Sequence, residues 1–516
     1  MARSAIHLLK TAIPVLCLTS FSQLSHAKCG CPIDTQSPMA SSEQSHTTSP
    51  VKASQTDIEW EKGNNSWDNV PKDNHRIEIS KGWKLPNSNT WLTIGGMAKF
   101  DAYHDLEASS ADPFEAYHIS PKSSISSRMN NNTKLIVRQS NINISTISET
   151  RVGEIKTFLE GDFAANNYFG GGESTNRHYI SLNSICFRLR EVYVETSGFL
   201  FGQTTTTFSD REAVGYTLIH NGVTGHSALR LPMVRYTWYN PFLVPENGST
   251  RLMIGAEAGT TDYSQYSGFK SFTLPNGVPG SVYAVDQLEN DTRVTPRSRG
   301  VSPLPNFTAQ LRFEKKGLGH IAFRGLARYF TIRPDKTTTI RDMGWGLGVS
   351  TRLFVTKSDS IFFNYSAGRG IGYYIFDLPC QSLAYNVETK THAVQFAQGI
   401  ILGFEHYWTD HLRSNVIAGV SQVNNARFLK DKMKNVAQIR GGIPAVYDST
   451  SMDAIGIYQN DIAFVNHRIQ QVTVNLMYKP TAALEMGVEY THAKRTTISG
   501  QHGIAKRFQV SFMYRF

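Results

Sequence analysis

The sequence lacks long apolar runs after its first residues. Its 516 residues include 40% hydrophobic and 18% charged side chains, and the mean hydropathy is −0.30. A helix needs a run of about 18 apolar residues to cross a membrane. A protein that spans a membrane with helices is therefore excluded. Strands that cross a membrane are not excluded, because their alternating pattern hides their hydrophobicity.

Cysteine is scarce and carries no recognisable spacing. The five cysteines include Cys29 and Cys31, which flank a glycine, and the isolated Cys186 and Cys380. There is no CxxC repeat and no Cys/His spacing for zinc. A ring closed by Cys29 and Cys31 would be cramped, so we expect free thiols or pairing elsewhere.

Signatures of catalysis and of nucleic-acid binding are also missing. The glycines of 344–348 and 368–372 lack the strand-to-helix setting that a phosphate cradle needs. No metalloprotease helix or nucleophile elbow is present, and the histidines are scattered. The basic balance is not accompanied by a nucleic-acid-binding module. We therefore predict no catalytic residue, no cofactor, no metal site and no nucleic-acid partner.

The N-terminal residues read as a targeting signal followed by a polar tail. Residues 1–27 have a basic start, an apolar stretch and small residues before a cleavage point. Residues 28–73 are rich in Ser, Thr, Gln, Asn and Pro, and we expect 76–85 to be a short docking strand that leads to the barrel. We expect a signal peptide at 1–27, a flexible periplasmic segment at 28–90 and one domain at 91–516. Removal of the signal takes Arg3 and Lys10 from the net charge of +10, which leaves about +8 and favours anionic solutes or lipid head groups.

The last ten residues form an amphipathic strand. Every second residue is large and apolar, so one face of the strand carries Phe508, Val510, Phe512, Tyr514 and the terminal Phe516. The opposite face of the strand carries polar side chains and one methionine. Successive side chains of a strand point to opposite faces. This pattern is typical of a closing strand of a membrane barrel, and a sandwich strand that happens to end the chain is the alternative.

The rest of the domain contains about sixteen strand candidates by alternation and turn signals. They lie near 91–104, 131–148, 152–164, 187–197, 198–204, 231–240, 249–260, 306–315, 320–331, 343–356, 359–367, 391–408, 411–422, 461–478, 483–495 and 505–516. Short and long connections alternate along the chain, as they do when one end of a barrel has turns and the other has loops. We predict an all-β fold: a transmembrane antiparallel β-barrel in the outer membrane, with both termini periplasmic.

Arginines occur on strands that divide cleanly into two faces. An arginine at the lipid midplane costs about 2–4 kcal/mol, so Arg235, Arg324 and Arg328 should face the barrel interior. The alternation of inward and outward side chains shifts at 138–140 and at 188–191, and β-bulges would explain these shifts. Aromatic residues gather at one set of strand ends, as expected at a head-group boundary. They are Trp91, Trp238, Tyr239, Trp408, Tyr478, Tyr514 and Phe516.

Several stretches resemble the DcaP-type porin family. They are Trp91 to Tyr103 (WLTIGGMAKFDAY), Val137 to Ser140 (VRQS), Gly153 to Phe163 (GEIKTFLEGDF), Phe187 to Glu195 (FRLREVYVE), Phe201 to Thr204 (FGQT) and Pro232 to Thr237 (PMVRYT). The resemblance implies a sixteen-stranded homotrimeric diffusion porin that favours small anionic solutes. The sequence departs from the family pattern at two places. Residues 28–73 have no heptads for a coiled-coil stalk, and Thr205 replaces the usual Trp after Gly-Gln-Thr. By resemblance to such barrels, Phe516 marks the chain for the barrel assembly machinery.

Candidate pore residues come from one loop and from the inward faces of the strands. In general porins the loop that follows the fifth strand folds inward, which here is 205–230. It supplies Asp210, Arg211, Glu212 and His220 as a mixed-charge constriction. We predict a positive wall from Arg235, Arg324, Arg328 and Arg507, with Arg190 and Arg312, because rings of one sign set pore selectivity. The alternative is that these arginines pair with Glu154, Glu160 and Asp162 and only stabilise the wall.

The function predicted is a diffusion porin for small hydrophilic, anionic solutes, in contact with outer-membrane lipids. One alternative is an outer-membrane barrel that acts through external loops, such as 261–305 and 423–460, as an adhesin or enzyme. Another is a secreted soluble β-protein that binds polysaccharide.

Overall fold

The protein is described here by a computed structural model. It describes residues 81–107, 114–122, 130–165, 186–219, 221–240, 242, 248–266, 269–273, 279–283, 300–333, 338–379, 381–386, 389–428, 465–498 and 500–516. The predictions for 1–80, including Cys29 and Cys31, lie outside these residues, as do those for His220, Cys380 and most of 261–305 and 423–460.

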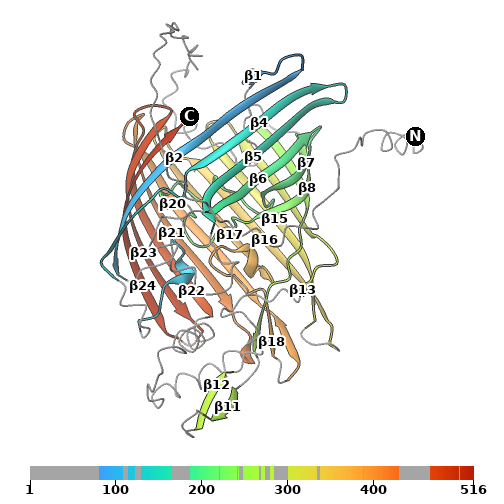
Figure 1. The fold of residues 1–516 in the computed structure, drawn as a ribbon, viewed down its shortest axis with the longest axis vertical. Helices are drawn as coiled ribbons and strands as arrows, with labels where there is room; N and C mark the ends of the chain where they lie inside the picture. Colours follow the sequence, from blue (N-terminus) through green and yellow to red (C-terminus); the bar gives the residue numbers. More distant parts are fainter. Residues whose placement is uncertain are drawn as a thin grey trace, which may run out of the picture. The chain divides into compact units, whose positions relative to one another are not determined.

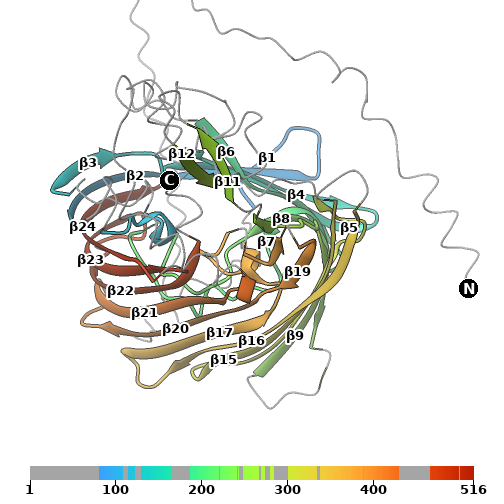
Figure 2. The same ribbon diagram turned by 90° about the horizontal axis from the view of Figure 1, so that it is seen from below.

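Sixteen antiparallel strands form one closed β-barrel, whose strands slant in Figure 1 and form a ring in Figure 2. In chain order they are β2 (Thr90–Glu107), β3 (Asn132–Ile136) continued by β4 (Asn141–Thr150), β5 (Gly153–Ala165), β6 (Cys186–Thr196), β7 (Phe199–Thr205), β8 (Arg230–Tyr239), β9 (Gly248–Glu257), β14 (Asn306–Lys315), β15 (Gly319–Ile332), β16 (Ile340–Phe354), β17 (Asp359–Arg369), β20 (Phe396–Tyr407), β21 (Leu412–Asn424), β22 (Asn466–Tyr478), β23 (Leu484–Thr497) and β24 (His502–Arg515).

Smaller elements accompany the barrel. They are β1 (Trp83–Lys84), β10 (Tyr263–Tyr266), β11 (Phe269–Thr273), β12 (Pro279–Tyr283), β13 (Gly300–Val301), β18 (Leu383–Asn386), β19 (Thr391–Val394) and the short 3-10 helices η1 (Ala116–His118) and η3 (Gly372–Tyr374). β10, β18 and β19 form a separate three-stranded sheet. Among the described residues, no helix has the length and apolar character needed to cross a membrane.

The barrel closes where the last strand meets the first. β24 pairs antiparallel with β2 from Met97 opposite Arg515 to Asp105 opposite Arg507, while the other edge of β2 pairs with β3 and β4. The backbone of Phe516 exchanges two hydrogen bonds with Gly96, each 3.1 Å long. The barrel begins and ends at the same end, as an even number of strands requires.

The side chains are arranged inversely to those of a soluble protein. On β24, Phe512 and Tyr514 are exposed whereas Gln509 and Ser511 are buried. The same alternation holds on β8, β15 and β22. The outward apolar side chains can contact lipid, and the inward polar side chains can contact water or polar parts of the chain. This pattern confirms the predicted membrane barrel and contradicts the soluble β-protein, whose strands would bury their apolar face.

Two predicted strands are interrupted. The candidate 131–148 is broken between β3 and β4, where a tight turn forms because the Ser140 N–H donates to the Val137 carbonyl at 3.0 Å. The candidate 391–408 is broken at Gln395, whose carbonyl accepts from Gly370 and whose N–H donates to Ser382. β19 therefore leaves the barrel and pairs with β18.

The predicted parity slip near residue 190 is a bulge. On β5 the residues Glu160 and Gly161 are consecutive, but their partners on β6 are Glu191 and Leu189, so Arg190 is the extra residue. An extra residue changes which face the following side chains take. The β-bulge explanation is therefore confirmed at this position.

Candidate functional site

The connection between β7 and β8, described over residues 206–219 and 221–229, folds into the barrel. Its backbone binds walls that are far apart in the sequence. The Thr207 N–H donates to Glu257 of β9 at 2.7 Å, and the Leu218 N–H donates to Glu489 of β23 at 2.7 Å. Because these strands belong to different parts of the ring, the loop extends across the interior. We name residues 206–219 and 221–229 the constriction loop, after the role that the sequence analysis predicts for it.

Two wall glycines let the constriction loop lie directly on the barrel. The loop backbone at Thr224 and Gly225 contacts Gly419 and Gly399, and a Cβ atom at either wall glycine would collide with a loop carbonyl oxygen. Gly225 also has a positive φ of 103°, which side chains other than glycine rarely adopt. Backbone-to-backbone packing therefore fixes this part of the loop against β20 and β21.

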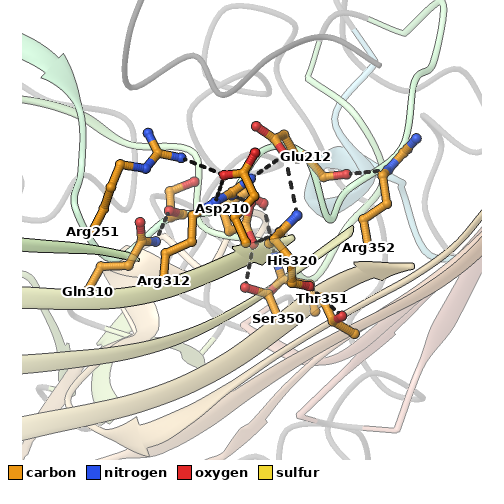
Figure 3. A network of polar contacts seen from close by, with 12 residues as sticks. Asp210, Glu212, Arg251, Gln310, Arg312, His320, Ser350, Thr351 and Arg352 are labelled. Atoms are coloured by element: carbon orange, nitrogen blue, oxygen red, sulfur yellow. Dashed lines mark hydrogen bonds and ion pairs between the residues drawn. The ribbon is translucent and has the colours of Figure 1, made fainter. Parts of the chain in front are cut away.

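The acidic side chains of the loop are held by the wall, as Figure 3 shows. Asp210 accepts a hydrogen bond from Ser350 at 2.6 Å and lies 2.8 Å from His320 Nε2. Arg312 pairs with Glu212 and also approaches Asp210, at 3.5 Å. Burial alone would raise the pKa of Asp210, but His320, Arg312 and Ser350 hold that pKa well below its usual value. The carboxylates of Asp210 and Glu212 therefore both bind wall side chains and anchor the loop to the wall.

Two further arginines of the wall bind the loop through its carbonyl oxygens. Arg324 donates to the Phe208 carbonyl at 3.0 Å and to Asn364 at 2.7 Å. Arg352 donates to the Glu212 carbonyl at 2.9 Å and to Glu405 at 2.6 Å. These guanidiniums satisfy a turn of buried backbone, which would otherwise leave unpaired acceptors.

A second connection, described over residues 370–379 and 381–382 between β17 and β18, also enters the barrel. Arg328 of β15 holds it by donating to the Gly370 carbonyl and to Ser382, and it pairs with Asp262 at 3.1 Å. The apolar side of this segment packs on the constriction loop in one buried cluster with the wall. The cluster contains Phe208, Leu231, Leu326, Ile371, Tyr374, Ile375, Leu378, Ala397 and Val423.

A third segment, residues 114–122 with η1, also packs against the inner wall of the barrel. Arg495 of β23 donates to the Ile119 carbonyl at 3.0 Å. A buried apolar cluster joins this segment to the constriction loop and to three wall strands. It contains Phe114, Ala116, Ile119, Ile219, Ile469, Ala493 and Ala505.

These three inward segments leave a cavity of about 700 Å³ beside the wall. Its lining has seven basic residues and six acidic ones. The basic residues are Lys99, Arg188, Arg190, Arg211, Arg230, Arg352 and Arg515, and the acidic residues are Glu115, Glu160, Glu191, Glu212, Asp377 and Glu405. Charged groups of both signs therefore line one cavity.

The predicted site residues fall into two groups. Arg190, Arg211 and Glu212 line the cavity. The others described do not line it, because the inward segments or neighbouring strands cover them. These covered residues are Asp210, Arg235, Arg312, Arg324, Arg328 and Arg507.

The alternative prediction was that the wall arginines pair with acidic residues. Many of them do, but mostly with acids other than the predicted Glu154, Glu160 and Asp162. Arg190 does pair with Glu160 at 2.9 Å and with Asp162 at 3.2 Å. Arg507, in contrast, binds Asp105 through two hydrogen bonds of 2.7 and 2.9 Å. A cation that shares its charge with a buried carboxylate adds little to the field of a pore.

Sequence reasoning missed Arg230, Glu115 and Asp377 of the cavity. Arg230 is the first residue of β8, where the strand pattern gives no reason to single it out. Glu115 and Asp377 lie in long connections, and long connections are usual on the external side of such barrels. Only the inward course of those connections brings them to the cavity, and no local pattern signals that course.

The comparisons with known proteins agree with this architecture. Residues 82–509 match the protein family described as "Porin subfamily". The outer membrane channel DcaP of Acinetobacter baumannii is 19% identical, with 85% of this chain and 100% of that chain covered and a TM-score of 0.61. An anion-selective porin from Comamonas acidovorans is 8% identical, with 83% of this chain and 100% of that chain covered and a TM-score of 0.45. None of the curated proteins matches the chain. Since the family match covers most of the sequence, this chain belongs to the porin subfamily and is an outer-membrane β-barrel channel.

Proposed function

We propose that the channel passes small hydrophilic anions in preference to cations, through a cavity narrowed by the constriction loop. The observation that carries this proposal is the division of charge at residues 210–212. Asp210 and Glu212 are bound by Arg312 and His320 of the wall, whereas Arg211 between them lines the cavity. Asp210 does not line the cavity, and Glu212 lines it but is paired with Arg312 of the wall, so Arg211 is the cation that the loop presents to the solute.

One more guanidinium supports this reading. Arg211 lies close enough to Arg230 for the two positive charges to repel each other. Both arginines line the same cavity. Like charges that crowd together in a narrow passage attract counter-ions and exclude ions of their own sign.

The assembly proposed around this channel follows from the same barrel. Phe516 would direct the chain to the barrel assembly machinery, the exposed apolar faces would contact outer-membrane lipids, and three copies would form a homotrimer. Both chain ends would be periplasmic, because the barrel begins and ends on the side of the short turns. Long connections are usual on the external side of such barrels.

Replacing Arg211 and Arg230 together with glutamine tests the selectivity. A unit charge about 4 Å from an ion contributes about 1 kcal/mol in water, so the double variant should reduce the anion-to-cation permeability ratio by roughly fivefold or more. Reversal potentials in planar bilayers under a KCl gradient measure that ratio. The control is Arg341→Gln, an exposed arginine of β16 that does not line the cavity. If the double variant and the control keep the same ratio as the unaltered channel, the proposal fails.

The selectivity should also depend on pH through Asp377. Burial, reinforced by the nearby charge of Glu115, raises the pKa of Asp377 to about 7, despite opposing contributions from Thr224 and Arg495. Below that pKa the carboxyl is neutral, and above it a negative charge joins the cavity. We therefore expect anion preference to be stronger at pH 6 than at pH 8. The nearby His118 and His226 should not contribute, because burial lowers the pKa of each to about 4.

The measurement is the reversal potential of one channel preparation at both pH values. In Asp377→Asn the side chain cannot ionise, so the difference between pH 6 and pH 8 should shrink. A pH dependence that persists unchanged in this variant would assign the effect to another group.

A further inference from the structure

The cavity contains a cation with unused hydrogen-bond donors. Among the described residues, none accepts a hydrogen bond from the Arg230 guanidinium, and its Nε is buried without a partner. Its Nε lies 3.5 Å from Glu191 Oε1, which is an ion-pair distance too long for a good hydrogen bond. A guanidinium has five N–H donors, so most of the donors of Arg230 are free to bind something that enters the cavity.

The same cavity contains carboxyl groups with unused acceptors. Asp377 is 3% exposed, and neither of its carboxylate oxygens has a hydrogen-bond partner of good geometry among the described residues, although the Thr224 hydroxyl and the Tyr117 backbone lie close enough to lower its pKa. Glu115 Oε2 is buried without a hydrogen-bond partner as well, although His118 lies 3.5 Å from it. Buried polar atoms without partners are costly and rare, so each calls for an explanation.

The donors of Arg230 and the acceptors of Asp377 and Glu115 belong to the lining of the same cavity. The Phe376 N–H donates to the His226 carbonyl at 2.7 Å, which docks the segment carrying Asp377 onto the constriction loop carrying Arg211. Arg188, which also lines the cavity, lies close enough to Glu115 to favour the charged form of that carboxyl, although burial dominates and raises its pKa. A bound solute can therefore meet both signs of charge.

We propose that this cavity is a binding site for zwitterionic solutes, which carry a carboxylate and an ammonium group. The carboxylate would accept hydrogen bonds from Arg230, and the ammonium would donate to Asp377 and Glu115. A cavity of about 700 Å³ is in the usual size range for small-molecule sites. The inference rests on the proposed function, since it names the class of solute that the channel holds best.

The experiment compares two probes that differ only in the ammonium group. Current block by γ-aminobutyrate and by butyrate is recorded on the full-length channel at pH 8, where Asp377 is mostly ionised. Charge-assisted hydrogen bonds to buried acids favour the zwitterion, so its half-blocking concentration should be about tenfold lower than that of butyrate.

Variants separate the two ends of the site. Asp377→Asn should raise the half-blocking concentration of γ-aminobutyrate about tenfold and should strengthen block by butyrate, because a negative charge is lost. Arg230→Gln should weaken block by both probes. If Asp377→Asn does not assemble, Glu115→Gln tests the same end, and weaker block by γ-aminobutyrate alone is expected.

Two results would overturn the inference. One is equal block by the two probes in the unaltered channel, and the other is block by γ-aminobutyrate that neither acidic variant weakens. Reversal potentials recorded from the same channels separate this failure from that of the proposed function. Anion preference without selective block by the zwitterion removes only the inference, whereas loss of anion preference removes the proposed function itself.

Discussion

Replacing Asp210 with alanine is expected to raise the single-channel conductance and its noise. The carboxylate of Asp210 is buried among His320, Arg312 and Ser350. Removing one partner of a buried ionic network costs about 3–5 kcal/mol, because the remaining charges stay buried without compensation. Every 1.4 kcal/mol changes an equilibrium about tenfold. The docked form of the constriction loop should therefore lose most of its advantage, and the loop should leave the passage for part of the time.

Two observations accompany that measurement. The barrel strands do not depend on Asp210, so the variant should still migrate as a folded barrel in unheated detergent gels. Asp410→Ala, which removes an exposed carboxylate from the turn between β20 and β21, should leave the conductance unchanged. A folded Asp210→Ala channel with unaltered conductance would show that the loop does not limit the current.

The substitution Leu402→Arg is expected to destabilise the barrel strongly. Leu402 lies in the middle of β20, and its side chain is 60% exposed on the outer face. An arginine at the bilayer midplane costs about 2–4 kcal/mol, but only about 0–1 kcal/mol near the interface. Val355, which follows β16, is 62% exposed and lies at a strand end. Val355→Arg is therefore the matched control.

Urea unfolding of the two variants in lipid vesicles measures the difference in unfolding free energy. Leu402→Arg should lower that free energy much more than Val355→Arg does. Equal losses would mean that depth in a membrane does not govern these positions, and the outward apolar band would need another explanation.

Much of the barrel could be predicted because its strands follow a local rule. The alternation of Phe508, Val510 and Phe512 with polar neighbours needs no knowledge of the fold, and lipid outside makes the pattern strict. The predicted strands match the observed barrel, apart from the interruptions near Ser140 and at Gln395. At Gln395 the break depends on hydrogen bonds to two distant segments, which no local pattern contains.

The cavity could be predicted only in part, because its residues come together through tertiary contacts. Arg211 was found because the position of its loop in the strand order marks it. Asp377 was not, since its connection enters the barrel through contacts with Arg328 and with an apolar cluster assembled from the whole ring. The partner of Arg507 is Asp105, 402 positions away in the sequence, and only barrel closure brings the two together.

Planar-bilayer recording of the purified full-length protein under a KCl gradient tests the central claim most directly. The account predicts step-like currents through a water-filled barrel, with a reversal potential set mainly by chloride. A folded, membrane-inserted barrel that gives no steps, or whose reversal potential follows potassium, would contradict it.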